Sequence, residues 1–255
     1  MSTDRAKTGI TGLDDLIEGG LPRGYSYVLI GGPGTGKTTF GTQFVYKGAM
    51  DYNEPGLYVT FDEPPYSIIN NMRRFNWNLA DVESKGKLLF IDASPIRSPP
   101  PGQTETFAPM VLKQSFLGGE KFKIDEVIDS VKDAKRKIGA QRAVIDSIAA
   151  LTMQFEKEMD VRLHILRLIK ELTEMGLTTI MLSENVEEQK EVIRFGADAF
   201  LAQGVMVLHM FRIEESNVKA LEIRKMRGVK HIEKLCPYRI TGDGIEVYPE
   251  ENVFR

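Results

Sequence analysis

The sequence predicts an α/β fold, in which helices flank a mainly parallel sheet and antiparallel strands extend its C-terminal edge. Three observations support this prediction. Apolar runs of strand length alternate with helical patterns over the first three quarters of the chain. A glycine-rich turn, GGPGTGKT at residues 31–38, joins the first such strand to a helix. The last quarter consists of apolar runs separated by short turns, including Gly242-Asp243-Gly244, which indicates antiparallel pairing.

The elements follow in chain order. Leu13, Leu16 and Ile17 are at helical spacing and predict a short helix before the first strand. Five prolines and three glycines between residues 94 and 120 predict a long surface loop, because they interrupt both periodicities. Strands are predicted at residues 25–30, 57–61, 87–91, 143–145, 177–182, 205–210, 218–223, 238–240 and 245–248, and longer helices from about residue 39 and at 66–75, 124–138 and 161–175.

The turn at residues 31–38 has the strand before it and the helix after it that a phosphate-binding loop requires. Its glycines permit backbone angles at which successive amide N–H groups converge on one anion. Lys37 would place a positive charge on the β- and γ-phosphates, and Thr38 would offer a hydroxyl ligand to Mg²⁺. The positive end of the following helix points at the same oxygens. We therefore expect a bound nucleoside triphosphate.

Carboxylates end two other predicted strands. Asp62 and Glu63 follow a strand that we expect beside the strand of the phosphate loop, where open parallel sheets bind their ligands. They are candidates for activating water, although acidic residues are also favoured in the first turn of a helix such as the one starting at Pro64-Pro65. Asp146 ends another apolar strand and would hold Mg²⁺ through water.

Composition limits the function classes. The length of 255 residues suits one large domain over residues 1–255, although length by itself also allows two smaller ones. A net charge of −3 gives no overall attraction to nucleic acid or to an anionic membrane. No apolar run approaches the roughly 18 residues of a membrane span, and no signal-peptide pattern follows Met1, so we expect a cytoplasmic protein. One cysteine and three scattered histidines argue against a zinc site.

Several separate motifs, in one order and over nearly the whole chain, resemble the KaiC family and its archaeal KaiC-like members, within the RecA-type ATPases. The resemblance implies one RecA-type P-loop core, ATP and Mg²⁺ as ligands, ATP bound between subunits, and a homo-oligomeric ring of usually six subunits. The motifs are TGITGLDDLIEGGLPRG near the N-terminus, GGPGTGKTTF, FDE at 61–63, FNWNL and GKLLFIDASP at 75–95, VIDS at 144–147, SEN at 183–185 and LEIRKMRGVKH at 221–231.

The resemblance also implies roles for individual residues. Asp62 and Glu63 correspond to a pair of glutamates that activates the attacking group; Glu63 is the favoured base, and Asp62 stays open. Thr38 and Asp146 correspond to the Mg²⁺ ligands. The implied ATP-binding residues within one subunit are Gly34, Thr35, Gly36, Lys37, Thr38 and Thr39, whereas Lys225, Arg227 and His231 match residues that reach a neighbour's nucleotide, and Thr241 matches a further interface contact. The alternative for these last residues is an exposed basic strand, whose charges discourage aggregation.

The sequence departs from the two-domain clock proteins of the family. It contains no second GxxxxGKT, so we expect no double ring from one chain, and no match to the phosphorylated Ser-Thr pair follows Asp146. Three functions remain open: a slow Mg²⁺-dependent ATPase ring with a regulatory or signalling role, a non-catalytic ATP-sensing assembly module, and a RecA/RadA-like DNA recombination accessory protein. The stretch at residues 186–191, VEEQKE, is acidic on balance and would repel DNA phosphates, which makes nucleic acid an unlikely partner. A protein partner cannot be named from the sequence.

Overall fold

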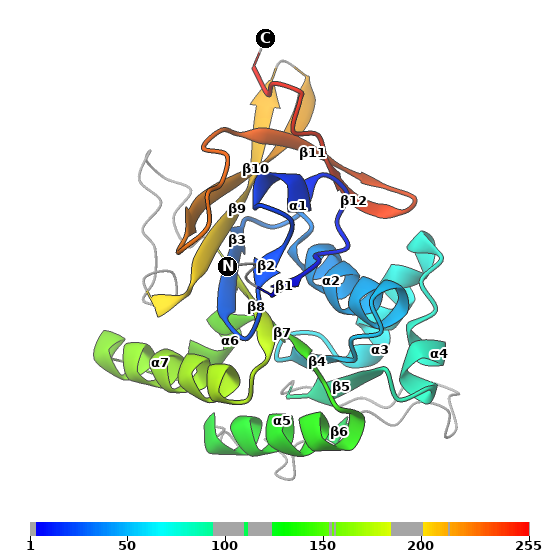
Figure 1. Cartoon of the computed structure of the whole chain (residues 1–255), viewed down its shortest axis with the longest axis vertical. Coiled ribbons are helices and arrows are strands. Elements are labelled where there is room, and N and C mark those ends of the chain that lie inside the picture. Colours follow the sequence, from blue (N-terminus) through cyan, green and yellow to red (C-terminus); the bar gives the residue numbers. More distant parts are fainter. Residues whose placement is uncertain are drawn as a thin grey trace.

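A ten-stranded sheet forms the centre of the computed structural model, which describes residues 4–93, 110–111, 124–152, 155, 157–184, 201–213 and 215–254. The strand order is β12-β11-β10-β9-β3-β8-β7-β4-β5-β6 (Figure 1). All neighbouring pairs from β9 to β6 are parallel, and β10, β11 and β12 continue the sheet in antiparallel fashion. The predicted fold class is therefore confirmed.

Each strand expected from the sequence is present. The sheet strands are β3 (Ser26–Gly31), β4 (Gly56–Thr60), β5 (Leu88–Asp92), β6 (Met110–Val111), β7 (Arg142–Asp146), β8 (Thr178–Glu184), β9 (Gly204–Ile213), β10 (Ser216–Met226), β11 (Cys236–Thr241) and β12 (Gly244–Val247). A separate two-stranded sheet joins β1 (Arg5–Ala6) to β2 (Leu21–Pro22). Neither β1 nor β2 was predicted, because two residues are too few to show a periodicity.

The helices also follow the apolar periodicity. They are α1 (Leu13–Leu16), α2 (Lys37–Asp51), α3 (Pro65–Met72) with a 3₁₀ turn at Arg73–Phe75, α4 (Leu79–Ser84), α5 (Ile124–Ile138), α6 (Ile148–Thr152) and α7 (Glu158–Glu174). The short helices α4 and α6 were not predicted. Helix α2 begins at Lys37, about two residues before the expected start, because Gly36 adopts a left-handed conformation (φ 96°) and serves as the N-cap.

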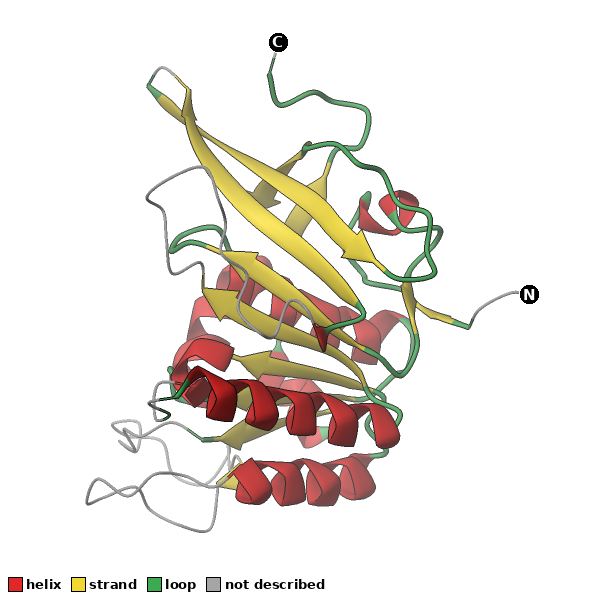
Figure 2. Ribbon diagram, turned by 90° about the vertical axis from the view of Figure 1, so that its left-hand side faces the viewer, coloured by secondary structure: helices red, strands yellow, loops and turns green. Residues whose placement is uncertain are grey.

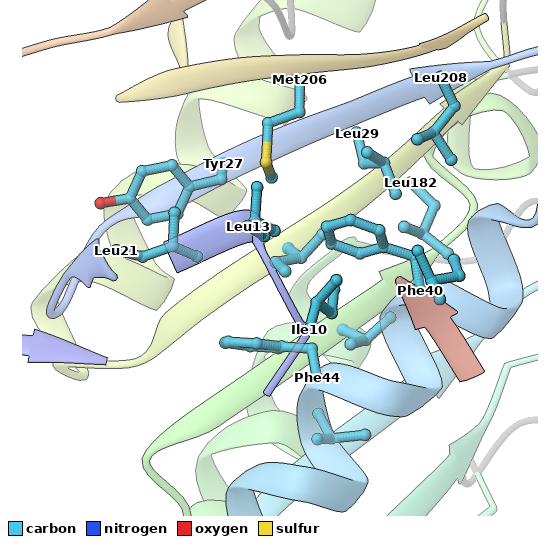
Figure 3. Packing of buried hydrophobic residues seen from close by; sticks show 14 of the residues in the cluster. Ile10, Leu13, Leu21, Tyr27, Leu29, Phe40, Phe44, Leu182, Met206 and Leu208 are labelled. Atoms are coloured by element: carbon cyan, nitrogen blue, oxygen red, sulfur yellow. The ribbon is translucent and has the colours of Figure 1, made fainter. Parts of the chain in front are cut away.

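Two apolar clusters cover the two faces of the sheet, beneath helices that lie on both sides of it (Figure 2). One contains residues of α1 to α4 and of the antiparallel strands, and the other contains residues of α5 and α7. In the first, Phe40 of α2 points toward Leu29, Leu182 and Leu208 from three neighbouring strands, and Phe44 lies farther along the same helix (Figure 3). The rings of Phe40 and Phe44 are fully buried. This packing holds α2, and with it the turn at residues 31–36, against the carboxyl end of β3.

One expectation about strand neighbours is wrong. Strand β4, which precedes Asp62, does not lie beside β3, because β8 and β7 are inserted between them. The sequence around a strand does not show which strands from later in the chain will pair beside it. The carboxyl ends of β3, β8, β7 and β4 nevertheless share one edge of the sheet, since all four strands are parallel.

Two predicted segments lie mainly or wholly outside the described residues. Of the loop expected at residues 94–120, the structure describes Met110–Val111, and this pair forms β6, parallel to β5, where no strand was expected. The acidic stretch at residues 186–191 lies outside the described residues. In the described part of the chain, every helix is too short or too polar to cross a membrane.

Candidate functional site

The turn between β3 and α2 has the geometry of an anion cradle. Gly34 and Gly36 have φ angles of 76° and 96°, which are strained for any residue with a side chain. The Thr35 hydroxyl donates to the Gly32 carbonyl over 2.8 Å and braces the turn from within. Lys37 Nζ donates to the Gly31 carbonyl over 2.8 Å, so its ammonium group lies over the turn. Thr39 follows in the first turn of α2 and is partly buried.

A buried carboxylate faces the start of α2. Asp146, at the end of β7, is 9% exposed, and its Oδ2 accepts hydrogen bonds from Thr38 Oγ1 (3.1 Å) and Tyr58 Oη (2.6 Å). Burial raises the pKa of Asp146, and these two hydrogen bonds oppose that rise. A hydroxyl and a carboxylate at this distance suit Mg²⁺, which takes few protein oxygens and keeps several waters. Within the described residues, no three His, Cys, Asp or Glu side chains converge on a metal position.

The acidic pair after β4 borders the same edge. Asp62 and Glu63 are exposed, and Asp62 Oδ2 accepts a hydrogen bond from the Ser147 hydroxyl over 2.7 Å. The backbone carbonyl of Glu63 accepts from the Thr60 hydroxyl, which anchors the turn while the Glu63 carboxylate faces solvent. The pair is thus tied to the ends of β4 and β7, and both carboxylates lie close enough to Asp146 for their negative charges to raise its pKa.

Lys37 lies among several carboxylates. Its Nζ is 4.0 Å from Glu184 Oε1 at the end of β8. Burial lowers the pKa of Lys37, and the negative charges of Glu184, Asp146 and Asp62 oppose that change. The site therefore contains a partly buried ammonium group surrounded by carboxylates. A polyphosphate and its metal ion could lie between this ammonium group and the carboxylates.

The antiparallel strands approach the turn from the other side. Lys219 Nζ of β10 donates to the Gly34 carbonyl over 2.6 Å, and Tyr238 Oη of β11 donates to the Thr35 carbonyl over 2.6 Å. Thr241 closes the β11–β12 turn, where its hydroxyl lies 3.0 Å from Glu246 Oε1. Its chain neighbour Ile240 packs on Gly36, so Thr241 belongs to the same side of the subunit as the turn.

Three of the predicted residues are not brought to this edge. Lys225 pairs with Val205, which pairs with Val28 in the middle of β3, and Arg227 follows the end of β10. Arg227 is exposed, and its backbone N–H donates to the Gln203 carbonyl over 3.0 Å. His231 lies farther along the same connection, with Nδ1 3.3 Å from the Val229 carbonyl. Within one subunit, Lys225, Arg227 and His231 therefore lie away from the turn.

Four residues of the site were not singled out from the sequence: Tyr58, Glu184, Lys219 and Tyr238. Tyr58 lies in a strand buried on both faces, so no alternation marks the direction of its side chain. Lys219 and Tyr238 reach the turn only through the pairing of β10 and β11 with the sheet. Glu184 ends an apolar strand as Asp146 does and belongs to the SEN motif at residues 183–185, but no role was assigned to it from the sequence.

Comparison with known proteins agrees with this geometry. The family model described as "ATPase: KaiC" matches residues 6–252. The circadian clock oscillator protein KaiC of Synechococcus elongatus is 37% identical over 96% of this chain and 44% of its own length, and that of Thermostichus vulcanus is 38% identical over 95% and 43%. The chain thus spans about half the length of these curated relatives.

A solved structure covers the same extent as the chain. The KaiC-like protein PH0186 from Pyrococcus horikoshii superposes with a TM-score of 0.79 at 35% identity, over 97% of this chain and 100% of that one. The resemblance inferred from the motifs is confirmed in sequence and in structure. The chain belongs to the KaiC family of P-loop ATPases.

Proposed function

We propose that the protein is a Mg²⁺-dependent ATPase that works as a homo-oligomeric ring, usually of six subunits, with a regulatory or signalling output. The observation that carries the proposal is the meeting of Lys37, Thr38 and Asp146 at the edge where β4 presents Asp62 and Glu63. The curated relatives are named circadian clock oscillator proteins, which favours a regulatory use of the ATP cycle.

Each residue has a distinct proposed role. The turn formed by Gly34, Thr35 and Gly36 surrounds the phosphates with N–H groups, and Lys37 neutralises their charge. Thr38 and Asp146 hold Mg²⁺, the latter through water, and the ion would neutralise charge that develops on the phosphate oxygens.

The attacking water needs a base on the open side of the site. Glu63 is the proposed base because its carboxylate faces solvent, whereas the Asp62 carboxylate already accepts the Ser147 hydrogen bond. Asp62 then orients the turn that follows β4. If its hydrogen bond from Ser147 were broken, Asp62 could act as the base in place of Glu63. An isolated subunit is proposed to turn ATP over slowly, since Arg227, the cation expected to assist the transition state, does not reach this edge of its own subunit.

Native mass spectrometry and phosphate release together test the proposal. With Mg·ATP we expect a ring mass and hydrolysis, and without Mg²⁺ we expect no hydrolysis. Glu63→Gln should bind ATP but turn it over about 10²- to 10⁴-fold more slowly, as expected when a positioned base is lost. Glu174→Gln is the matched control, because Glu174 is an exposed residue near the end of α7.

The outcomes separate two functions. ATP binding without phosphate release above the Glu63→Gln background would replace the catalytic role with that of a non-catalytic ATP-sensing module. A monomer mass under all nucleotide conditions would contradict the ring.

A further inference from the structure

We propose that Tyr238 is a positioning residue for the phosphate loop: its hydroxyl holds the Thr35–Gly36 peptide unit in the orientation that receives a nucleotide phosphate. This proposal deepens the proposed ATP site and depends on residues 34–39 being that site. Its basis is the contact between β11, near the C-terminus, and the loop that follows β3.

The contact is short and buried. Tyr238 is 2% exposed, Thr35 is also 2% exposed, and Tyr238 Oη donates to the Thr35 carbonyl over 2.6 Å. Burial raises the pKa of Tyr238 well above its usual range, so the hydroxyl keeps its proton and acts as a donor at any physiological pH. Water cannot easily replace this hydrogen bond at a buried position.

The geometry of a peptide unit links this bond to the ligand. The Thr35–Gly36 peptide is trans, so its C=O and N–H point in opposite directions. Holding the Thr35 carbonyl toward Tyr238 therefore directs the Gly36 N–H away from β11. Gly36 is also the N-cap of α2, where N–H groups serve as anion ligands.

A second contact from the same strand supports the first. A Cβ built on Gly36 would lie 2.8 Å from Ile240 Cδ1, so the backbone of Gly36 rests directly on the Ile240 side chain. Because residues two apart on a strand face the same side, Tyr238 and Ile240 act together. Strand β11 thus contacts both residues of the peptide unit that it is proposed to orient.

The proposed effect is preorganisation. Without the hydroxyl, the Thr35–Gly36 peptide can rotate in the free protein, and binding must then restrict it. A buried hydrogen bond of typical net strength corresponds to a loss of about five- to tenfold in nucleotide affinity.

Tyr238→Phe tests the proposal, and the chain offers a closely matched control. Tyr27 is 0% exposed, and its hydroxyl donates to the Pro22 carbonyl over 2.8 Å. Tyr27 lies near the start of β3. Phe40 and Leu208 border the phosphate loop, and Tyr27 lies away from both of them (Figure 3). Tyr27→Phe therefore removes the same kind of buried hydrogen bond without touching the phosphate loop.

The measurements are Mg·ADP binding by calorimetry, thermal unfolding, and hydrogen exchange of the peptide covering residues 31–40. Both variants should lose similar thermal stability. Only Tyr238→Phe should bind Mg·ADP about five- to tenfold more weakly. It should also exchange the loop amides faster than wild type in the absence of nucleotide, while Tyr27→Phe does neither.

Equal affinities of the two variants, with equal loop exchange, would overturn the proposal and leave Tyr238 a purely structural residue. If Tyr238→Phe does not fold, hydrogen exchange of the nucleotide-free wild type takes its place, and amides of residues 31–40 that exchange as fast as those of an unstructured peptide would also overturn the proposal. Lys37→Ala distinguishes failure of this proposal from failure of the proposed ATP site. If Lys37→Ala retains wild-type Mg·ADP binding, the assignment of the phosphate loop itself fails.

Discussion

Removing the Arg227 side chain should abolish most hydrolysis without abolishing ATP binding. Arg227 follows Met226, which pairs with Gly204, and Gly204 pairs with Tyr27 at the start of β3. Tyr27 and Gly31 are four positions apart along β3, or about 13 Å, and two strand spacings add about 10 Å sideways. Arg227 therefore cannot reach the loop of its own subunit, and any role at a phosphate requires a neighbouring subunit.

The expected size of the effect follows from that role. An arginine delivered from a neighbour to the transition state contributes about 10³- to 10⁵-fold to the rate of phosphoryl transfer. Arg227→Ala should thus lower phosphate release by this order while changing ATP affinity little. Lys234→Ala is the matched control, since Lys234 is an exposed cation on the same connection between β10 and β11.

Mixing two inactive variants provides the decisive assay. Lys37→Ala subunits have a dead loop but an intact Arg227, and Arg227→Ala subunits have the reverse. In a ring with head-to-tail interfaces, random mixing of equal amounts joins a working loop to a working arginine at about one quarter of the interfaces. Phosphate release should recover to about that fraction of the wild-type rate after subunit exchange. Mixed rings, demonstrated by mass, that recover no activity would refute delivery across the interface.

Two further predictions concern DNA and pH. The protein should bind DNA weakly at physiological salt, because its net charge is −3; filter binding that shows sub-micromolar affinity and a steep salt dependence would instead support a recombination role. Burial raises the pKa of Glu83 to about 7, so the folded state holds this proton more tightly than the unfolded state does. The resulting stability is fully present below about pH 4 and is lost as the pH rises through 7, so Glu83→Gln should be more stable than wild type by about 1–2 kcal/mol at pH 8.5, with little difference at pH 4.5. Urea unfolding at the two pH values measures this, and an equal difference at both would contradict the titration of Glu83.

Local sequence was sufficient for most of the elements and for the phosphate loop. Apolar periodicity located α5 and α7 because each buries one stripe of side chains. The loop at Gly31 to Thr38 was predictable because its chemistry depends on consecutive residues, whose glycines permit the turn and whose Lys37 and Thr38 follow directly. The resemblance implied that Thr38 and Asp146 lie at one metal site, and their side chains are hydrogen-bonded although 108 positions separate the two residues.

The tertiary structure decided which side chains meet. Whether β4 or β8 lies beside β3 depends on the packing of the whole sheet, so the neighbours of Asp62 could not be predicted from its own strand. Tyr58 donates to Asp146 because two strands buried on both faces stand side by side, a situation in which no polar pattern shows direction.

The sequence by itself determined the α/β class and the P-loop, because strand-helix alternation and the glycine-rich turn depend on neighbouring residues. The order of its motifs along the whole chain also showed the resemblance to the KaiC family. Only the tertiary structure decided that Lys219 and Tyr238 hold the phosphate loop while Lys225 and Arg227 lie away from it. The physical reason is the antiparallel course of β10. It brings Lys219 to the carboxyl end of β3 and carries Lys225 back toward the opposite end, and pairing between strands distant in sequence sets that register.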